Sequence, residues 1–194
     1  IAAPCFSPYQ QAERQIRPSA MFLDKGFSVF LVILGSQPRY AIPDEIEDLK
    51  RAIRYVRYNA KKFEINPVQI GITGGSAGGH LSLAVAMADE KIDSMAQDPI
   101  NRVSSRVQAA AVLYPPTDCL NWGGPGFNFI NNKSLQVANS IYGALDFTKW
   151  NQLTSTYDHI TDSSARIKIA REMSPIYYVS SDDPPIFIIH GDAD

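Results

Sequence analysis

The sequence predicts an α/β fold with a mostly parallel sheet flanked by helices. Short apolar runs alternate with longer segments of helical periodicity, and a glycine-rich turn joins one such run to the helical pattern that follows. Buried parallel strands are continuous apolar runs because helices cover both faces of the sheet. With 194 residues, 45% of them apolar and 20% charged, residues 1–194 are expected to form a single domain unit.

The first half of the chain predicts two helices and a strand. A helix is expected over residues 18–25, because Pro18 suits a first helical turn and Gly26 ends it. Residues 28–34 form an apolar run that predicts a buried strand. Residues 43–63 give the clearest helix, with acidic residues at its start and basic residues at its end, as the helix dipole favours. Its apolar stripe consists of Ile46, Leu49, Ile53, Val56, Ala60 and Phe63.

The second half predicts three further strands, over residues 69–73, 107–114 and 186–190, the last of them buried. Residues 76–88 predict a helix that is apolar nearly all round and therefore buried against the sheet. Residues 117–170 break the rhythm, because they are rich in Asn, Gly, Ser, Thr and aromatic residues. A long non-periodic stretch inside an α/β domain predicts a lid or another insertion.

The bulk composition excludes several classes of partner. A formal net charge of −2 argues against a polyanion-binding surface, so no nucleic-acid partner is expected. The longest apolar run, residues 27–34, is too short to span a membrane. No signal peptide is visible, and the compartment stays open. Cys5 and Cys119 fit neither a zinc site nor a disulfide scaffold, although a bridge between them stays open; no metal or cofactor is expected.

The chemistry-bearing motif is Gly74-Gly75-Ser76-Ala77-Gly78, which lies between an expected strand and an expected helix. A Gly-x-Ser-x-Gly motif in that setting predicts a nucleophile elbow, in which a sharp turn exposes a strained serine. The residues two before and two after the serine must be nearly side-chain-free, because strand and helix backbones approach closely there. We name residues 74–78 the elbow.

Two other interpretations compete with a nucleophile. In one, Ser76 merely caps the helix after a glycine turn. In the other, residues 74–79 form a phosphate-binding loop, but His80 and Leu81 occupy the positions where such a loop needs Lys and Ser or Thr. These two residues therefore argue against a phosphate-binding loop.

A serine nucleophile needs a histidine base and a carboxylate that orients it. Asp192 and Asp194 both follow the last expected strand, where a loop presents its side chains at the rim of the sheet. None of the histidines, His80, His159 and His190, occupies the position of the base, which should come after the acid. His80 is expected to pack or to hydrogen-bond inside the protein.

The chain resembles an α/β-hydrolase of the esterase/lipase group, close to the bacterial feruloyl- and acetyl-esterase-like branch. The resemblance implies that Asp194, rather than Asp192, is the triad acid, because the family places it last in a His-Gly-x-x-Asp pattern. It also implies that the backbone amide of Ala77 binds the oxyanion. The matching blocks are residues 35–40, 44–59, 66–67, 71–81, 114–118, 174–179 and 182–194.

Two family features are expected outside the chain: an oxyanion motif upstream of Ile1 and the catalytic histidine downstream of Asp194. The expectation is thus a partial domain that lacks the first strands and the histidine-bearing end, and is nearly inactive alone. The implied function is a serine carboxylester hydrolase acting on small-molecule or carbohydrate-linked esters. A serine peptidase of the prolyl-oligopeptidase type and a non-catalytic scaffold are the alternatives. Trp122, Phe127 and Phe129 could line a pocket for a sugar or an aromatic acyl ester.

Overall fold

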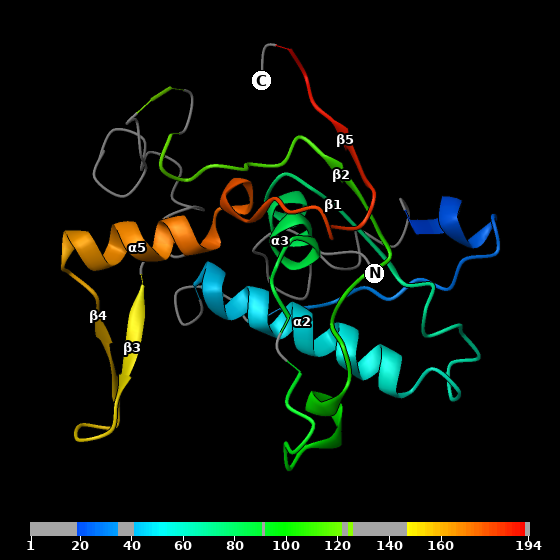
Figure 1. Ribbon diagram of the computed structural model, residues 1–194, viewed down its shortest axis with the longest axis horizontal. Coiled ribbons are helices and arrows are strands. Elements are labelled where there is room, and N and C mark those ends of the chain that lie inside the picture. Colours follow the sequence, from blue (N-terminus) through cyan, green and yellow to red (C-terminus); the bar gives the residue numbers. More distant parts are fainter. Residues whose placement is uncertain (1–18, 35–40, 91, 122–123, 126–146, 193–194) are drawn as a thin grey trace.

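A computed structural model describes residues 19–34, 41–90, 92–121, 124–125 and 147–192 (Figure 1). Its main sheet has three parallel strands in the order β1-β2-β5: β1 (Gly71–Gly75), β2 (Ala109–Leu113) and β5 (Ile186–Ile189). Gly75 pairs with Leu113, and Leu113 pairs with Ile189, so the three strands end level with one another. The predicted α/β fold with a parallel sheet is confirmed.

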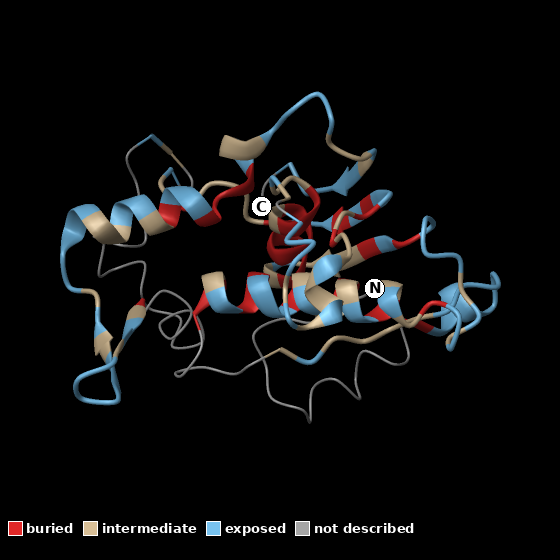
Figure 2. Ribbon diagram, turned by 60° about the horizontal axis from the view of Figure 1, so that its bottom comes forward, coloured by how far each residue is buried: buried red, intermediate tan, exposed pale blue. Residues whose placement is uncertain are grey.

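The helices pack on this sheet in the manner that their apolar faces dictate. α3 (Ala77–Ala86) contacts β1 and β2, and α2 (Ile42–Tyr58) packs on α3. Figure 2 shows α3 almost wholly buried at the centre of the molecule, as its all-round apolar pattern predicted. α5 (Ser163–Met173) contacts α2, and the chain also has two short 3-10 helices, η1 (Pro99–Arg102) and η4 (Pro175–Tyr178). Residues 19–23 are helical, within the helix predicted over residues 18–25.

α2 confirms the predicted apolar stripe, since Ile46, Leu49, Ile53 and Val56 are buried. The helix nevertheless ends at Tyr58 rather than at residue 63. Beyond the helix, the chain reverses over residues 60–65, where Glu64 adopts a left-handed φ of 54° and the Ile65 amide donates to the Ala60 carbonyl.

The predicted buried strand over residues 28–34 is wrong. The segment is extended, but within it only Leu31 makes a single-residue β-bridge. A cavity of about 790 Å³, lined by residues 26–30 together with β1 and β2, separates the segment from the sheet. An apolar run becomes a strand only where a neighbouring backbone supplies hydrogen-bond partners along its length, and residues 28–34 belong to neither of the two described sheets.

The prediction for residues 186–190 is half right. β5 forms, yet Phe187, Ile188 and Ile189 are 62%, 47% and 51% exposed, so the strand is not buried. β5 is an edge strand of the described sheet, and no described element packs over it. The apolar sequence of β5 favours burial, but the described residues leave these side chains exposed.

The predicted insertion over residues 117–170 includes a β-hairpin in its described part. β3 (Thr148–Asn151) pairs antiparallel with β4 (Thr156–His159). Trp150 faces Tyr157 across the hairpin, with the ring centroids 5.1 Å apart in a T-shaped arrangement. Figure 1 shows the hairpin projecting away from the main sheet. Whether this stretch acts as a lid stays a prediction, and Trp122, Phe127 and Phe129 lie outside the described residues.

Candidate active site

Ser76 is exposed at the junction between β1 and α3. Its backbone adopts φ 53° and ψ −123°, a combination that non-glycine residues rarely populate. Hydrogen bonds hold the residue on both sides: its amide donates to the Leu113 carbonyl at 2.9 Å, and its carbonyl accepts from the His80 amide at 3.0 Å. The geometry is that of a strained strand-to-helix turn with the serine at its apex.

The glycines of the elbow leave no room for side chains. A Cβ on Gly74 would lie 2.4 Å from the carbonyl oxygen of Gly78, closer than any real contact. The next glycine, Gly79, is also enclosed, because its Cβ would lie 3.1 Å from Cβ of Pro115. The expected crowding of strand and helix backbones at Gly74 and Gly78 is therefore confirmed.

α3 begins at Ala77, with Ser76 as its N-cap residue. The first amides of a helix have no acceptor within it, and they carry the positive end of the helix dipole. The Ala77 amide therefore lies next to the Ser76 side chain and is available to a ligand. An amide in this position can stabilise an oxyanion that forms when the serine attacks a carbonyl.

His80 is buried, as expected, with 2% exposure. Its Nδ1 donates to the Pro116 carbonyl at 2.9 Å, and its Nε2 is buried without a hydrogen-bond partner. Desolvation lowers the pKa of His80, despite the opposing hydrogen bond to Pro116, so the ring is neutral. His80 thus ties α3 to the loop after β2, and it does not present its imidazole at the surface beside Ser76.

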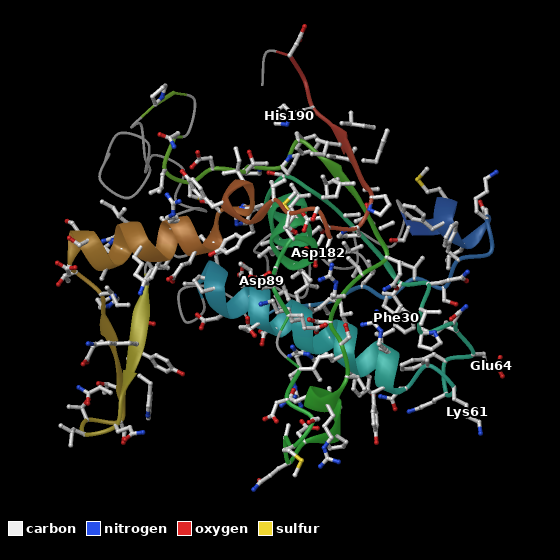
Figure 3. All side chains as sticks on the ribbon, viewed as in Figure 1. Phe30, Lys61, Glu64, Asp89, Asp182 and His190 are labelled. Atoms are coloured by element: carbon white, nitrogen blue, oxygen red, sulfur yellow. The ribbon has the colours of Figure 1, made fainter. Side chains whose placement is uncertain are left out.

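The other predicted residues sit at or near the ends of strands. His190 follows β5 (Figure 3), and Asp192 is exposed just beyond it. β5 lies two strands from β1, which places its end roughly 10 Å from the elbow. His159 ends β4 in the hairpin. Asp194 lies outside the described residues, so its role as the triad acid stays a prediction.

Two residues after β2 escaped the sequence analysis as site candidates. Tyr114 is half-exposed and has a left-handed φ of 39°, next to the elbow. Asp118 accepts hydrogen bonds from the Leu120 amide, from Asn121 and from the Tyr177 hydroxyl. Desolvation opposes these bonds, but together they lower the pKa of Asp118. Its carboxylate therefore links the segment after β2 to η4 through the hydrogen bond from Tyr177.

The described residues offer no other evident catalytic centre. No cluster of three or more His, Cys, Asp or Glu side chains in this part of the chain could hold a metal ion. Cys119 is a buried free thiol whose pKa burial raises to about 11, and Cys5 lies outside the described residues. A search of the described helices found none that is long and apolar enough to cross a membrane.

A parallel sheet, a buried helix behind a strained serine and a glycine-lined turn define an α/β-hydrolase. The family model described as BD-FAE matches residues 7–194, so the chain belongs to the BD-FAE family.

Similar proteins include a curated esterase and solved structures of ester-cleaving hydrolases. The chain is 31% identical over 172 residues to Esterase LipQ of Mycobacterium tuberculosis, covering 89% of this chain and 35% of that protein. The chain thus spans about a third of the length of LipQ and of a second relative from the same organism, the probable carboxylic ester hydrolase LipM. A truncated carbohydrate esterase from gut microbiota superposes with a TM-score of 0.69 at 27% identity, covering 100% of this chain and 66% of that chain. An acetyl ester-xyloside bifunctional hydrolase from Caldicellulosiruptor lactoaceticus gives a TM-score of 0.64 at 27% identity, covering 96% of this chain and 59% of that chain.

Proposed function

We propose that the chain carries the nucleophile and the acid of a serine carboxylester hydrolase. Ser76 attacks the ester carbonyl, and the Ala77 amide binds the oxyanion of the tetrahedral intermediate. The alcohol leaves, and water then hydrolyses the acyl-serine ester to release the acid and free Ser76. The observation that carries this proposal is the strained, exposed backbone of Ser76 at the start of α3.

Asp194 orients the histidine that takes the proton of Ser76. That histidine comes from outside these 194 residues, because His80 donates its Nδ1 proton to Pro116 inside the protein. His159 and His190 both precede the acid, whereas hydrolases of this fold place the base after it.

The substrate class is a short-acyl or carbohydrate-linked ester. Support comes from two similar proteins, a carbohydrate esterase and an acetyl ester-xyloside bifunctional hydrolase. The same similarity favours ester over peptide hydrolysis, although the prolyl-oligopeptidase type shares the elbow. A proline-containing peptide substrate therefore belongs in the test beside the esters.

The test compares variants of the complete gene product that contains these residues on p-nitrophenyl acetate. Ser76→Ala is expected to lose about 10³- to 10⁵-fold in kcat, because loss of one triad member removes the whole nucleophilic route. Ser164→Ala is the matched control, since Ser164 is an exposed serine on α5. Equal activity of the two variants would overturn the proposal, and faster cleavage of the proline peptide would replace the esterase with a peptidase.

A second pair of variants tests the acid. Asp194→Asn is expected to lower kcat by about 10³- to 10⁴-fold, because the histidine loses the group that orients it. Asp192→Asn changes the neighbouring carboxylate in the same loop and is expected to stay within about twofold of wild type. The opposite ranking would assign the acid to Asp192. The 194-residue chain assayed alone is expected to be nearly inactive, for want of the histidine.

A further inference from the structure

Tyr114 stands level with Ser76 on the neighbouring strand. Gly75 pairs with Leu113 in the parallel ladder, so the residue after each strand, Ser76 after β1 and Tyr114 after β2, emerges at the same edge of the sheet. Side chains at the carboxyl ends of parallel strands border the ligand sites of α/β proteins.

The side chain of Tyr114 turns back over the elbow. Its hydroxyl oxygen lies 3.1 Å, and its Cζ 3.4 Å, from the position that a Cβ on Gly75 would occupy. The phenol therefore fills the space that a side chain just before the nucleophile would take. The Tyr114 ring can lie there because Gly75 has no side chain.

The backbone of Tyr114 is held in a conformation that it would not adopt unaided. Its φ is 39°, although a bulky residue disfavours positive φ and a following proline disfavours it further. Its amide donates to the Ile189 carbonyl at 2.6 Å, and His80 binds the carbonyl of Pro116 two residues later. Strain of this kind persists where the surroundings over-determine it, and it clusters at functional sites.

The hydroxyl of Tyr114 makes no hydrogen bond to any residue that the structure describes, and the residue is 48% exposed. The phenol thus lies beside the nucleophile, and no described residue occupies its hydroxyl. An ester offers hydrogen-bond acceptors and no donors, so a phenol that binds an ester must donate.

We infer that Tyr114 is a specificity-determining residue that contacts the ester bound at Ser76. Its ring forms the wall of the site on the β2 side, and its hydroxyl donates a hydrogen bond to an oxygen of the substrate. His80 acts through it as a positioning residue, because it holds the loop that follows. The inference rests on the proposed function and adds a named contact for the substrate.

The test measures kcat and KM of the complete gene product on p-nitrophenyl acetate and p-nitrophenyl hexanoate. Tyr114→Phe keeps the wall and removes the donor, so KM is expected to rise about 3- to 10-fold with little change in kcat. Tyr114→Ala removes the wall, so the preference for acetate over hexanoate is expected to shift about tenfold toward hexanoate. Tyr58→Phe is the control, because Tyr58 is exposed at the far end of α2.

A double-mutant cycle tests the geometry without turnover. Gly75→Ala places a methyl group against the Tyr114 hydroxyl, whereas Tyr114→Phe removes that hydroxyl. The double variant is expected to melt about 2 °C or more above the sum of the two single effects.

The inference is overturned if both Tyr114 variants keep KM and the acetate-to-hexanoate ratio within about twofold of wild type, or if the melting effects simply add. Failure of the proposed function looks different, because Ser76→Ala would then retain the activity of wild type. If wild type shows no turnover, the rates at which methyl- and hexyl-fluorophosphonates modify Ser76 supply the same comparison of the Tyr114 variants.

Discussion

The elbow and the β3–β4 hairpin differ in how tightly they are packed: a Cβ on Gly74 would lie 2.4 Å from the carbonyl oxygen of Gly78, whereas Leu153, at the tip of the hairpin, is 97% exposed. The elements around the elbow, β1, β2, α2 and α3, pack against one another and contribute residues to the hydrophobic core. The hairpin's contacts among the described elements are mainly between its own two strands, among them the Trp150–Tyr157 ring pair. The contrast teaches that a strained serine needs packed neighbours, whereas the exposed tip of the hairpin is free to vary.

The largest expected effect breaks the elbow itself. Gly74→Ala is expected to lower the free energy of unfolding by about 3 kcal/mol or more, because the methyl group meets backbone that cannot move away. Urea denaturation followed by circular dichroism measures the loss. Gly71→Ala is the matched control in the same strand, since its Cβ would lie 3.5 Å from the Ala109 carbonyl, an ordinary contact. Equal losses in the two variants would show that the elbow is not the crowded place.

The second-largest expected effect concerns the hydrogen bonds that Arg57 makes from α2. Arg57 donates to the carbonyls of Pro67, Ser104 and Arg106, and so ties α2 to the segments that lead into β1 and β2. Arg57→Met is expected to cost about 2 kcal/mol, because three carbonyls, two of them partly buried, lose their charged donor. Arg51→Met removes an exposed pair with Asp98 and is expected to cost less than about 0.5–1 kcal/mol. Chemical denaturation compares the two, and a larger loss for Arg51→Met would contradict the account.

A pH-dependent effect arises from Glu45, which is fully buried on α2 without a hydrogen-bond partner. Desolvation, followed by Asp44 and Asp48, raises the pKa of Glu45 from 4.5 to about 8. The folded protein then holds a proton that the unfolded chain releases, so Glu45 lowers stability as pH rises from about 4.5 to about 8, by at most about 1.4 kcal/mol per pH unit.

Glu45→Gln is expected to match wild type near pH 5 and to be more stable near pH 8.5, as measured by thermal melting across that range. Glu47→Gln, at a site exposed on the same helix, is the control and leaves the slope unchanged. A wild-type slope that survives in Glu45→Gln would place the titrating group elsewhere.

The smallest effect belongs to the hairpin. Leu153→Ser is expected to change the free energy of unfolding by less than about 0.5 kcal/mol, because the side chain has almost nothing to lose. Differential scanning calorimetry provides the measurement. A loss as large as that of Gly74→Ala would mean that the hairpin tip is packed in solution and that the comparison fails.

The elbow was predictable because its information is local. Three glycines and a serine between an apolar run and a helical pattern leave few conformations, and the structure has the expected turn at Ser76. That residues 28–34 would stay outside the described sheet was not predictable, because an apolar run does not reveal whether a hydrogen-bond partner lies beside it. The hairpin lacks a glycine turn: Ser155 supplies the left-handed residue, so the usual hairpin signal is absent.

The role of Tyr114 was hidden for a related reason. Neither a tyrosine nor a following proline predicts a left-handed backbone, and this one is imposed by β5 and by the loop that His80 holds. Parallel register brings Tyr114 to the elbow, and register between segments far apart in sequence follows from the fold. The motif therefore predicted Ser76 as the nucleophile, but it could not predict that Tyr114 lies beside it.

The central claim is that Ser76 is the nucleophile of an ester hydrolase, and covalent labelling tests it most directly. The complete gene product is treated with a serine-directed fluorophosphonate, digested and mapped by mass spectrometry. The account predicts one adduct on Ser76 that forms as esterase activity is lost and is absent from Ser76→Ala and from heat-denatured protein. Loss of activity with the adduct on another residue, or full activity with Ser76 modified, would contradict it.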